Sequence, residues 1–500
     1  MGAAAGDYHK PLPARSFLTR NYAIVAALLF YSAASLIIHG QVNRIQPGPY
    51  MDEIFHVPQC QKYCRGLYSE WDPKITTLPG TYIVTSTIMR VFNNLLESGD
   101  PCSTYNLRAF NLGVSAVNLI LIYLIVRHYN PELSLTKCAF SALNIATFPV
   151  LYFFSFLYYT DSISTAFLLL MHYMFLRGRY GYSALAGGYS VFTRQTNIVW
   201  VLYHGINSIL EVLTRTFGEK IFLYPLEYRK YLMGSSQPAK VKKSKRSKSS
   251  TKRPKPVKPV KPPFHLPSIP QIWRACGDDF GDRGCNYVLV GVSFLVFVIY
   301  NGSIVVGDKQ AHQATLNFPQ IGYFALIFGI FTSPFLLVRM KTVLKKMVYF
   351  PCNTLFFTGI LTALIYYNSP VHPYILADNR HYTFYIWKRF YERAYWLRFV
   401  WIPFYMLVWV FIITAMGVQK VYLFTYVFCT CINIIPQLLM EFRYFIPGYL
   451  YARMTFRDPS WIELVLEFTL NVLINVATLY LFLHKPFKWP DSTDVQRFMW

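Results

Sequence analysis

The chain has 500 residues, of which 54% are hydrophobic, 18% aromatic and only 14% charged. This composition is too apolar for one or two soluble domains and is typical of an all-α polytopic membrane protein. The formal net charge of +24 does not indicate a nucleic-acid-binding protein, because eleven Lys or Arg residues lie between Lys240 and Lys261 and many others flank apolar segments.

The first apolar segment, residues 21–40, is long enough to cross a bilayer. Lys10, Arg15 and Arg20 precede it, and no clear small-residue cleavage site follows it. We therefore expect a retained helix whose N-terminus lies in the cytosol, followed by a long loop, residues 41–106, on the opposite side of the membrane.

Further apolar segments predict roughly 12 or more membrane-spanning helices, divided between an N-terminal half, residues 1–229, and a C-terminal half, residues 271–500. The predicted spans are 107–126, 137–157, 161–176, 184–222 (long enough for two short or broken helices), 286–300, 318–338, 347–367, 397–416, 421–439 and 462–483. If spans alternate, the basic connectors fall in the cytosol, among them Arg177–Arg179 and His484–Lys485.

The same alternation places three polar segments on the side of the 41–106 loop: residues 301–317, 369–396 and 441–460. We expect these segments to converge with Asp52 on one cavity.

Residues 230–270 are dominated by Lys, Ser and Pro. Like charges repel one another and the segment has little apolar surface to bury, so we expect a disordered cytosolic loop. A nucleic-acid-binding arm or a localisation signal is the sharper alternative, but no interleaved aromatic residues or binding fold accompany the charge.

The most informative stretch is Tyr50–His56, which holds two adjacent acids, Asp52 and Glu53, and a histidine. Neighbouring residues on a helix point about 100° apart, so at most one acid can face a given substrate atom. Asp52 could instead be the N-cap of a helix that begins at Glu53, and this role is weighted equally with catalysis. His56 would share the face of Asp52, but an interfacial histidine is the more common case.

Three later motifs place cations on the same predicted side, where each has a functional and a structural interpretation. Each motif alone is more commonly a polar turn or an interfacial anchor, but together on one side the three supply the cations that could hold a lipid phosphate. The motifs are Gly307-Asp308-Lys309 with His312, Asp378-Asn379-Arg380-His381-Tyr382, and Glu441-Phe442-Arg443.

Together with Met51-Asp52-Glu53-Ile54-Phe55-His56, Trp71-Asp72-Pro73 and Thr76-Thr77-Leu78-Pro79-Gly80, these motifs resemble those of the dolichyl-phosphate-glucose-dependent alpha-1,2-glucosyltransferases of the endoplasmic reticulum. The resemblance covers almost the whole chain except the basic insert. It implies the multispanning GT-C fold, a lumenal active site, and transfer of the third, terminal glucose from dolichyl-phosphate-glucose to a dolichyl-diphosphate-linked oligosaccharide.

The family's reaction inverts the anomeric centre, so a base must act on the acceptor hydroxyl. The resemblance assigns this role to Asp52, with Glu53 as the rival. Candidates for contacts with the phosphate or the sugars are Lys309, Arg380, His312, His381 and, less strongly, Arg443, with His56, Asp308, Asp378 and Tyr382 near them. Trp71 could stack on a sugar or belong to an interfacial aromatic belt.

We expect no cofactor and no metal ion, because no acidic pair is spaced like the metal-binding motif of nucleotide-sugar transferases and the nine cysteines form no metal-binding pattern. A helical Cys60–Cys64 bridge would be strained, and pairing with Cys102 stays open. Glycosylation of Asn301 is open as well. The oligomeric state is not defined by the sequence, and a monomer is expected.

The competing interpretation is a transporter or a channel component, in which ionisable groups lie inside the membrane. Arg194 is the residue that favours it, although an arginine that reaches the interface from a helix break explains it better. Asp161 lies so near the edge of its span that a helix cap suffices. A non-catalytic scaffold would leave the clustered charges without a role.

Overall fold

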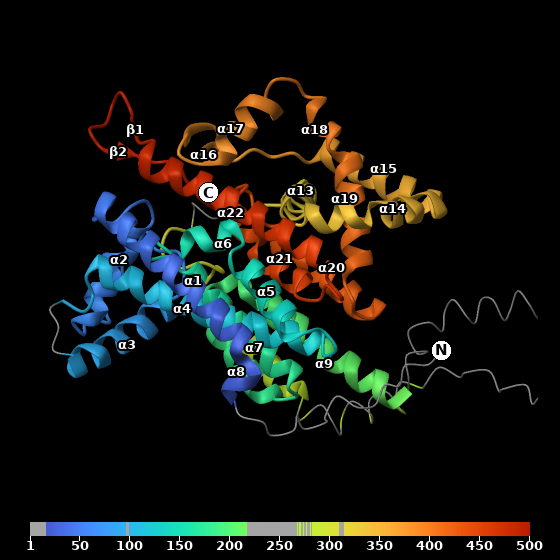
Figure 1. Ribbon diagram of the computed structural model, residues 1–500, viewed down its shortest axis with the longest axis horizontal. Coiled ribbons are helices and arrows are strands. Elements are labelled where there is room, and N and C mark those ends of the chain that lie inside the picture. Colours follow the sequence, from blue (N-terminus) through green and yellow to red (C-terminus); the bar gives the residue numbers. More distant parts are fainter. Residues whose placement is uncertain are drawn as a thin grey trace, which may run out of the picture.

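The computed structural model describes residues 17–96, 100–217, 283–309 and 315–500, with a few single positions between 268 and 281. The predicted basic loop and His312 lie outside the described residues. The described part is almost entirely helical, with one short antiparallel strand pair near the C-terminus (Figure 1).

The elements of the N-terminal half are α1 Phe17–Ile45, α2 Glu53–Cys64, α3 Gly80–Leu96, α4 Thr104–Tyr129, α5 Leu135–Ala146, α6 Pro149–Phe154, α7 Asp161–Leu176, α8 Tyr180–Thr193, η1 Gln195–Asn197 and α9 Ile198–Phe217. Those of the C-terminal half are α12 Cys285–Asn301, α13 Gln320–Phe331, α14 Ser333–Tyr349, α15 Pro351–Tyr367, α16 Pro373–Ala377, α17 Tyr382–Ile386, η3 Trp387–Tyr391, α18 Leu397–Val400, α19 Ile402–Ala415, α20 Lys420–Ile434, η4 Phe442–Phe445, α21 Ile446–Arg453, α22 Trp461–His484, β1 Phe487–Lys488 and β2 Val495–Gln496.

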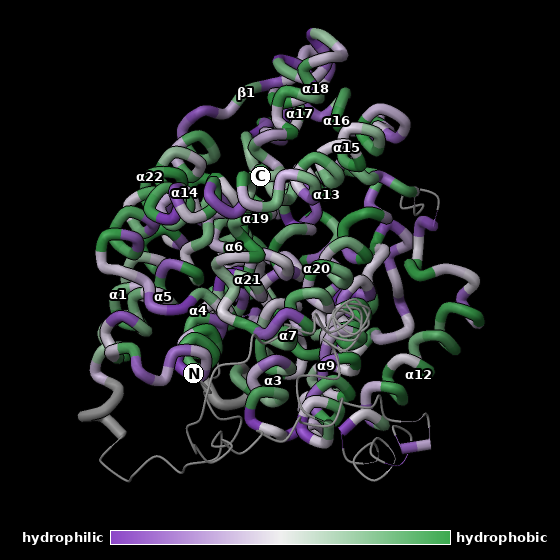
Figure 2. Tube along the Cα trace, turned by 90° about the vertical axis from the view of Figure 1, so that its right-hand side faces the viewer, coloured by the Kyte–Doolittle hydropathy of each residue, from purple (hydrophilic) through white to green (hydrophobic). Residues whose placement is uncertain are grey.

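Four of the described helical segments are long and apolar enough to cross a membrane: Tyr22–Ile45 in α1, α4, Leu397–Ala415 across α18 and α19, and α22. The pair α13 and α14, bent by 106°, would count as a fifth. Apolar residues lie exposed along outer helices such as α12, which Figure 2 shows in green and which suits contact with lipid. The protein is therefore a helical, multi-pass membrane protein, and the larger expected number of spans stays a prediction.

Breaks inside the apolar segments explain why few of the described helices are long enough to cross a membrane. Residues 137–157 form two pieces, α5 and α6, separated before Pro149, and the predicted double helix at 184–222 is confirmed as α8 and α9 with a break at Arg194. Proline has no backbone N–H to donate and interrupts the hydrogen-bond ladder of a helix.

The two halves pack directly against each other. Helix α9 lies against α20, and α5 and α6 lie against α22. Helix α22 runs in the same direction as α1, because the ring of Phe468 lies 6.3 Å from that of Phe30 and the ring of Phe482 lies 5.7 Å from that of Tyr50. The end of α22 therefore lies at the end of the bundle that carries Asp52.

This direction corrects the predicted side of the C-terminus. The sequence placed His484–Lys485 on the side opposite Asp52, and it placed all of residues 441–460 on the Asp52 side. In the structure, the Lys137 ammonium donates to the carbonyl of Pro459 (3.3 Å) at the opposite end of the bundle. The chain passes from one end of the bundle to the other between Arg443 and Pro459, along a stretch in which only the eight residues of α21 and the short turn η4 are helical. The buried Arg453 of α21 is held by Glu467 of α22 at 2.7 Å.

We predict that an impermeant maleimide labels cysteines at Ser69 and Asp494 from the same side of sealed vesicles, and a cysteine at Glu132 from the other side. All three positions are exposed, and the first two lie at the Asp52 end of the bundle. The background should lack the exposed free cysteines Cys285 and Cys352. Labelling of the Asp494 position together with the Glu132 position would contradict the observed direction of α22.

Candidate active site

The segment that carries Asp52 is fixed by a buried ion pair between Glu53, the first residue of α2, and Arg108 of α4. Both side chains are 0% exposed, and two guanidinium nitrogens contact the two carboxylate oxygens at 2.8 and 2.5 Å. The carboxylate also accepts hydrogen bonds from the backbone N–H groups of Tyr158 (2.6 Å) and Tyr50 (3.0 Å). Glu53 is thus fully engaged inside the protein and has no path to a substrate.

Arg108 uses every N–H donor that it has. The three donors not given to Glu53 bond the side chain of Asn43 (3.1 Å) and the carbonyls of Gln46 (2.6 Å) and Gly48 (3.0 Å). A buried charge is tolerated only when it is paired and its hydrogen bonds are complete. The pair therefore fixes the end of α1 and the loop that leads to Asp52.

Asp52 lies on the other side of this turn and is accessible. Its side chain is 43% exposed. Helix α2 begins at Glu53 as predicted, but the Asp52 side chain forms no capping hydrogen bond. Its backbone N–H donates to the hydroxyl of Tyr159 (3.1 Å), and Oδ2 accepts from Arg443 at 3.3 Å, whereas Oδ1 has no hydrogen-bond partner among the described residues. The carboxylate is held in place and keeps one oxygen available.

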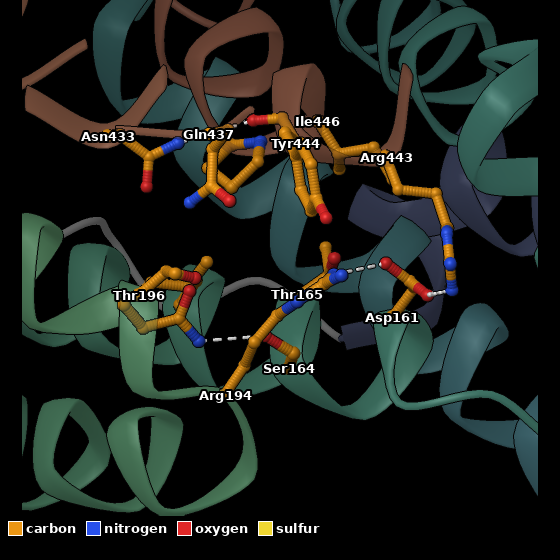
Figure 3. A pocket seen from close by; sticks show the side chains of 13 residues that line it. Asp161, Ser164, Thr165, Arg194, Thr196, Asn433, Gln437, Arg443, Tyr444 and Ile446 are labelled. Atoms are coloured by element: carbon orange, nitrogen blue, oxygen red, sulfur yellow. Dashed lines mark hydrogen bonds and ion pairs between the residues drawn. The ribbon is translucent and has the colours of Figure 1, made fainter. Parts of the chain in front are cut away.

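Arg443 of η4 is the centre of an ion network beside Asp52. Its guanidinium bonds Glu441 and lies 3.4 Å from Asp161, which also pairs with Arg194. Figure 3 shows the Asp161 carboxylate between the two arginines. The predictions that Asp161 is only a helix cap and that Arg194 reaches the membrane interface were wrong, because each satisfies the other's charge inside the bundle. Arg443 was predicted to contact phosphate, but three carboxylates surround it.

His56 and Trp71 belong to an aromatic cluster near Asp52 that also contains Tyr82 and Tyr159. The Nδ1 atom of His56 lies 2.5 Å from the hydroxyl of Tyr82, and the Trp71 ring packs edge to face against the Tyr82 ring at 5.8 Å. Burial lowers the pKa of His56, so its ring is neutral at pH 7. The Trp71 ring therefore packs against this cluster.

The Gly307-Asp308-Lys309 turn lies against the loop that follows Trp71. The N–H of Val306 donates to the carbonyl of Thr76 (3.2 Å). Gly307 has a φ of +63°, and a Cβ there would lie 2.4 Å from the carbonyl oxygen of Ile75, so only glycine fits. Lys309 is exposed and donates to the carbonyl of Asn301 (2.5 Å), while Asp308 is half-buried.

The charge of Arg380 acts on Tyr50 and on Tyr159, whose hydroxyl accepts from the Asp52 N–H. Arg380 forms a bidentate pair with Asp378, with both contacts at 2.8 Å. Burial raises the pKa of Asp378, but hydrogen bonds from Arg380 and the charge of His381 outweigh this effect and hold that pKa below its ordinary value. The carboxylate of Asp378 thus stays ionised and orients Arg380.

A C-terminal tail, residues 485–500, connects this segment to the Asp52 loop. Its Met499 N–H donates to the carbonyl of Arg380 (2.9 Å), and the carbonyl of Trp500 lies 2.7 Å from Nδ1 of His381. The Tyr382 ring packs edge to face against the Trp500 ring at 5.2 Å.

Farther along the tail, the Arg497 N–H donates to the Tyr50 hydroxyl (2.7 Å), which donates back to the Arg497 carbonyl (2.8 Å). Segments around residues 50 and 380 therefore lie on one side of the bundle, as predicted.

A disulfide between Cys64 and Cys102 closes the predicted loop 41–106. It ties the end of α2 to the start of α4, and Cys60 stays free and buried. Such a bond is typical of a compartment that is more oxidising than the cytosol.

A small polar cavity of about 20 Å³, enough room for one or two water molecules, lies next to the ion network. It lies between α7, η1, α20 and η4. Of the predicted site residues that the structure describes, only Arg443 lines it. The predicted convergence of three segments on Asp52 is thus supported for the side of the bundle, but the cavity itself is lined by α7, η1, η4, the start of α21 and the end of α20 with Gln437 after it.

The arrangement suits an acid–base step on a polar substrate. An accessible carboxylate is oriented by a guanidinium group, and Arg380 and Lys309 lie on the same side of the bundle. No three His, Cys, Asp or Glu side chains of the described segments are grouped so as to hold a metal ion. Sequence analysis gave no site role to Tyr159, Asp161 or Arg194. The only signal for the last two was the rarity of charges within apolar segments.

Comparisons with known proteins agree on one family. The DIE2/ALG10 family matches residues 46–454. A mouse protein named Dol-P-Glc:Glc(2)Man(9)GlcNAc(2)-PP-Dol alpha-1,2-glucosyltransferase is 35% identical, covering 96% of this chain and 99% of its own. Proteins of the same name from Arabidopsis thaliana and Yarrowia lipolytica are 34% and 30% identical, covering 92% and 94% of this chain and 96% of their own length in both cases. No solved structure matches the chain.

We predict that Glu53→Gln destabilises the protein by about 3–5 kcal/mol, because it leaves the buried Arg108 without its countercharge. Thermal unfolding of the purified protein in detergent would show a lower midpoint. Glu70→Gln is the matched control, since Glu70 pairs with Lys62 at the surface and such pairs contribute little. An unchanged midpoint for Glu53→Gln would contradict a structural role of the pair.

Proposed function

Because the chain belongs to the DIE2/ALG10 family, we propose that it acts as its relatives are named to act. It is a dolichyl-phosphate-glucose-dependent alpha-1,2-glucosyltransferase. It transfers the terminal glucose to the diglucosylated, dolichyl-diphosphate-linked oligosaccharide that serves as the precursor of N-glycans.

Asp52 is the base that accepts the proton of the acceptor hydroxyl. The observation that supports this assignment is the difference between the two neighbouring acids: Glu53 is completely buried and bonded, whereas Asp52 is exposed and has an unbonded Oδ1. The family's donor is a beta-linked glucosyl phosphate and the new linkage is alpha, so one displacement inverts the anomeric centre. The base acts on the face opposite the leaving phosphate.

The leaving group is a phosphate and needs no strong general acid, so cations that receive its charge suffice. Arg380 is the best-placed candidate, because Asp378 fixes its orientation while its side chain remains 23% exposed. Lys309 is exposed on the turn that contacts Thr76, and His381 follows Arg380 and lies 3.7 Å from Asp378. Arg443 instead orients Asp52, because its donors are used by carboxylates.

The proposal includes the GT-C architecture, roughly 12 or more spans once broken helices are counted, and an active monomer. The Asp52 side faces the lumen of the endoplasmic reticulum. The Cys64–Cys102 disulfide on that side supports this orientation. Arg194, which favoured a transporter, forms an ion pair with Asp161 beside the active site and no longer requires that interpretation.

We predict that Asp52→Asn lowers glucose transfer by at least about a hundredfold, because an amide cannot act as a general base. The assay combines the purified protein, dolichyl-phosphate-glucose and the diglucosylated lipid-linked acceptor. Unlike Glu53→Gln, this variant should keep the thermal stability of the wild type, since Asp52 is exposed. An active Asp52→Asn enzyme would exclude Asp52 as the base.

We predict that transfer does not depend on a divalent metal ion, because cationic side chains replace the metal as the acceptor of the phosphate charge. Pre-treatment with EDTA should leave the initial rate within about twofold of the untreated rate. A loss of activity that is restored by added Mg²⁺ or Mn²⁺ would contradict the prediction.

A further inference from the structure

Asp161 links the two arginines of the ion network beside Asp52. Its Oδ1 atom pairs with Arg194, and its Oδ2 atom lies 3.4 Å from a nitrogen of Arg443. The three side chains come from different elements: Asp161 begins α7, Arg194 lies at the break after α8, and Arg443 belongs to η4. Figure 3 shows how the arginines approach the carboxylate from two sides. The Asp161 side chain is 1% exposed, so it does not act on a substrate itself.

Arg443 carries this contact on to the proposed base. Two nitrogens of its planar guanidinium group contact the two acids, Asp52 at 3.3 Å and Asp161 at 3.4 Å. Glu441 bonds the same group, and the ring of Tyr159 lies 5.0 Å from its central carbon. Because the guanidinium group is rigid, a shift toward one carboxylate changes its distance to the other. The Asp52 contact is thus coupled to the Asp161 contact.

Water screens these charges only weakly. The cavity that Asp161, Arg194 and Arg443 line has about 20 Å³, which is enough for one or two water molecules. The three side chains are between 1% and 18% exposed. Partly buried charges are screened much less than charges at a surface, so the charge of each group acts on its neighbours in the network.

The network carries one negative charge, because three carboxylates share two guanidinium groups. Its members are Asp52, Asp161, Glu441, Arg194 and Arg443. Removing the carboxylate of Asp161 would make the network neutral, whereas removing the guanidinium group of Arg194 would leave two negative charges. These two changes therefore act on Asp52 in opposite directions.

Titratable groups that face Asp52 from α2, α3 and the segment before α7 keep one charge state around neutral pH. Burial lowers the pKa of His56 and raises the pKa of Tyr82 and of Tyr159 well above the ordinary value, so these three side chains are uncharged. Two nearby ion pairs are each neutral overall, Glu53 with Arg108 and Asp378 with Arg380. The charge that acts on Asp52 is therefore set mainly by Arg443 and the other partners of Arg443.

We propose that Asp161 and Arg194 are positioning residues, which act through Arg443 and determine how strongly it holds the base Asp52. The inference rests on the proposed function, in which Asp52 is the base. Asp161 competes with Asp52 for Arg443, and Arg194 competes with Arg443 for Asp161. Loss of Asp161 therefore strengthens the hold of Arg443 on Asp52, and loss of Arg194 weakens it.

The test measures the pH dependence of kcat/KM for the acceptor with the full-length purified protein. Activity falls on the acid side of the profile, where the general base becomes protonated. Asp161→Asn removes a negative charge and favours the ionised base, so this acid limb should move to lower pH by about half a unit or more. Arg194→Gln removes a positive charge and should move the limb to higher pH by about the same amount.

The double variant Asp161→Asn/Arg194→Gln keeps the network at one negative charge. Its acid limb should return to within about 0.2 units of the wild-type position. Each single variant leaves one partly buried charge without its partner and lowers the thermal midpoint, whereas the double variant leaves none. If one single variant does not fold, the shift between the other and the double variant still tests the inference.

Glu467→Gln is the matched control. Glu467 is a buried carboxylate that pairs with the buried Arg453 at 2.7 Å. It lies in the part of α22 that begins near Pro459, at the end of the bundle opposite Asp52. This variant also leaves a buried arginine unpaired and should lower the thermal midpoint, but its acid limb should stay at the wild-type position.

Acid limbs that stay in place in the single variants, or that move in the same direction in both, would overturn the inference, because a purely structural role predicts no opposite shifts. A shift in the Glu467→Gln control equal to that of Asp161→Asn would overturn it as well. A wild-type protein that transfers no glucose, or an active Asp52→Asn variant, would instead overturn the proposed function, and the inference with it.

Discussion

The buried pair of Glu53 and Arg108 is the interaction on which the rest of the site depends. Moving two charges out of water is costly, and the cost is offset here because all five donors of Arg108 and both oxygens of Glu53 are bonded. The pair fixes the turn between α1 and α2 in one conformation. Since consecutive residues point in different directions, the same turn that buries Glu53 presents Asp52 to the substrate. One acid serves the fold, and its neighbour remains available for chemistry.

Beyond this turn, the site separates charges by position. Three carboxylates surround Arg443, whereas Arg380 lies on the same side of the bundle but outside this network. The C-terminal tail fixes the distance between these regions, because it bonds Tyr50 through Arg497 and the backbone of Arg380 through Met499. The carboxylate proposed as the base and the arginine proposed to receive the phosphate charge therefore belong to different segments of the chain.

Local signals in the sequence predicted several of these features. The adjacent acids identified the Asp52 segment, the helix begins at Glu53, and the break at Arg194 is present. The partners of these residues could not be predicted, because Arg108 and Asp161 lie in other helices and their pairing depends on tertiary packing. The side of the C-terminus was wrong for a different reason: the chain passes between the two ends of the bundle within residues 443–459, which contain no long apolar helix, and missing this passage reverses the direction of α22. The basic connectors did not reveal that the C-terminus had been placed at the wrong end of the bundle, because a short basic motif such as His484-Lys485 is compatible with either side of a membrane.

The central claim is that the Asp52 carboxylate contacts the hydroxyl that receives glucose. A structure of the enzyme with the acceptor and an unreactive donor analogue would measure this contact directly. The account predicts that Oδ1 of Asp52 lies about 3 Å from the acceptor 2-hydroxyl, with Oδ2 still bound by Arg443. An acceptor hydroxyl that points to another residue, with Asp52 beyond hydrogen-bonding reach and no water between them, would contradict it.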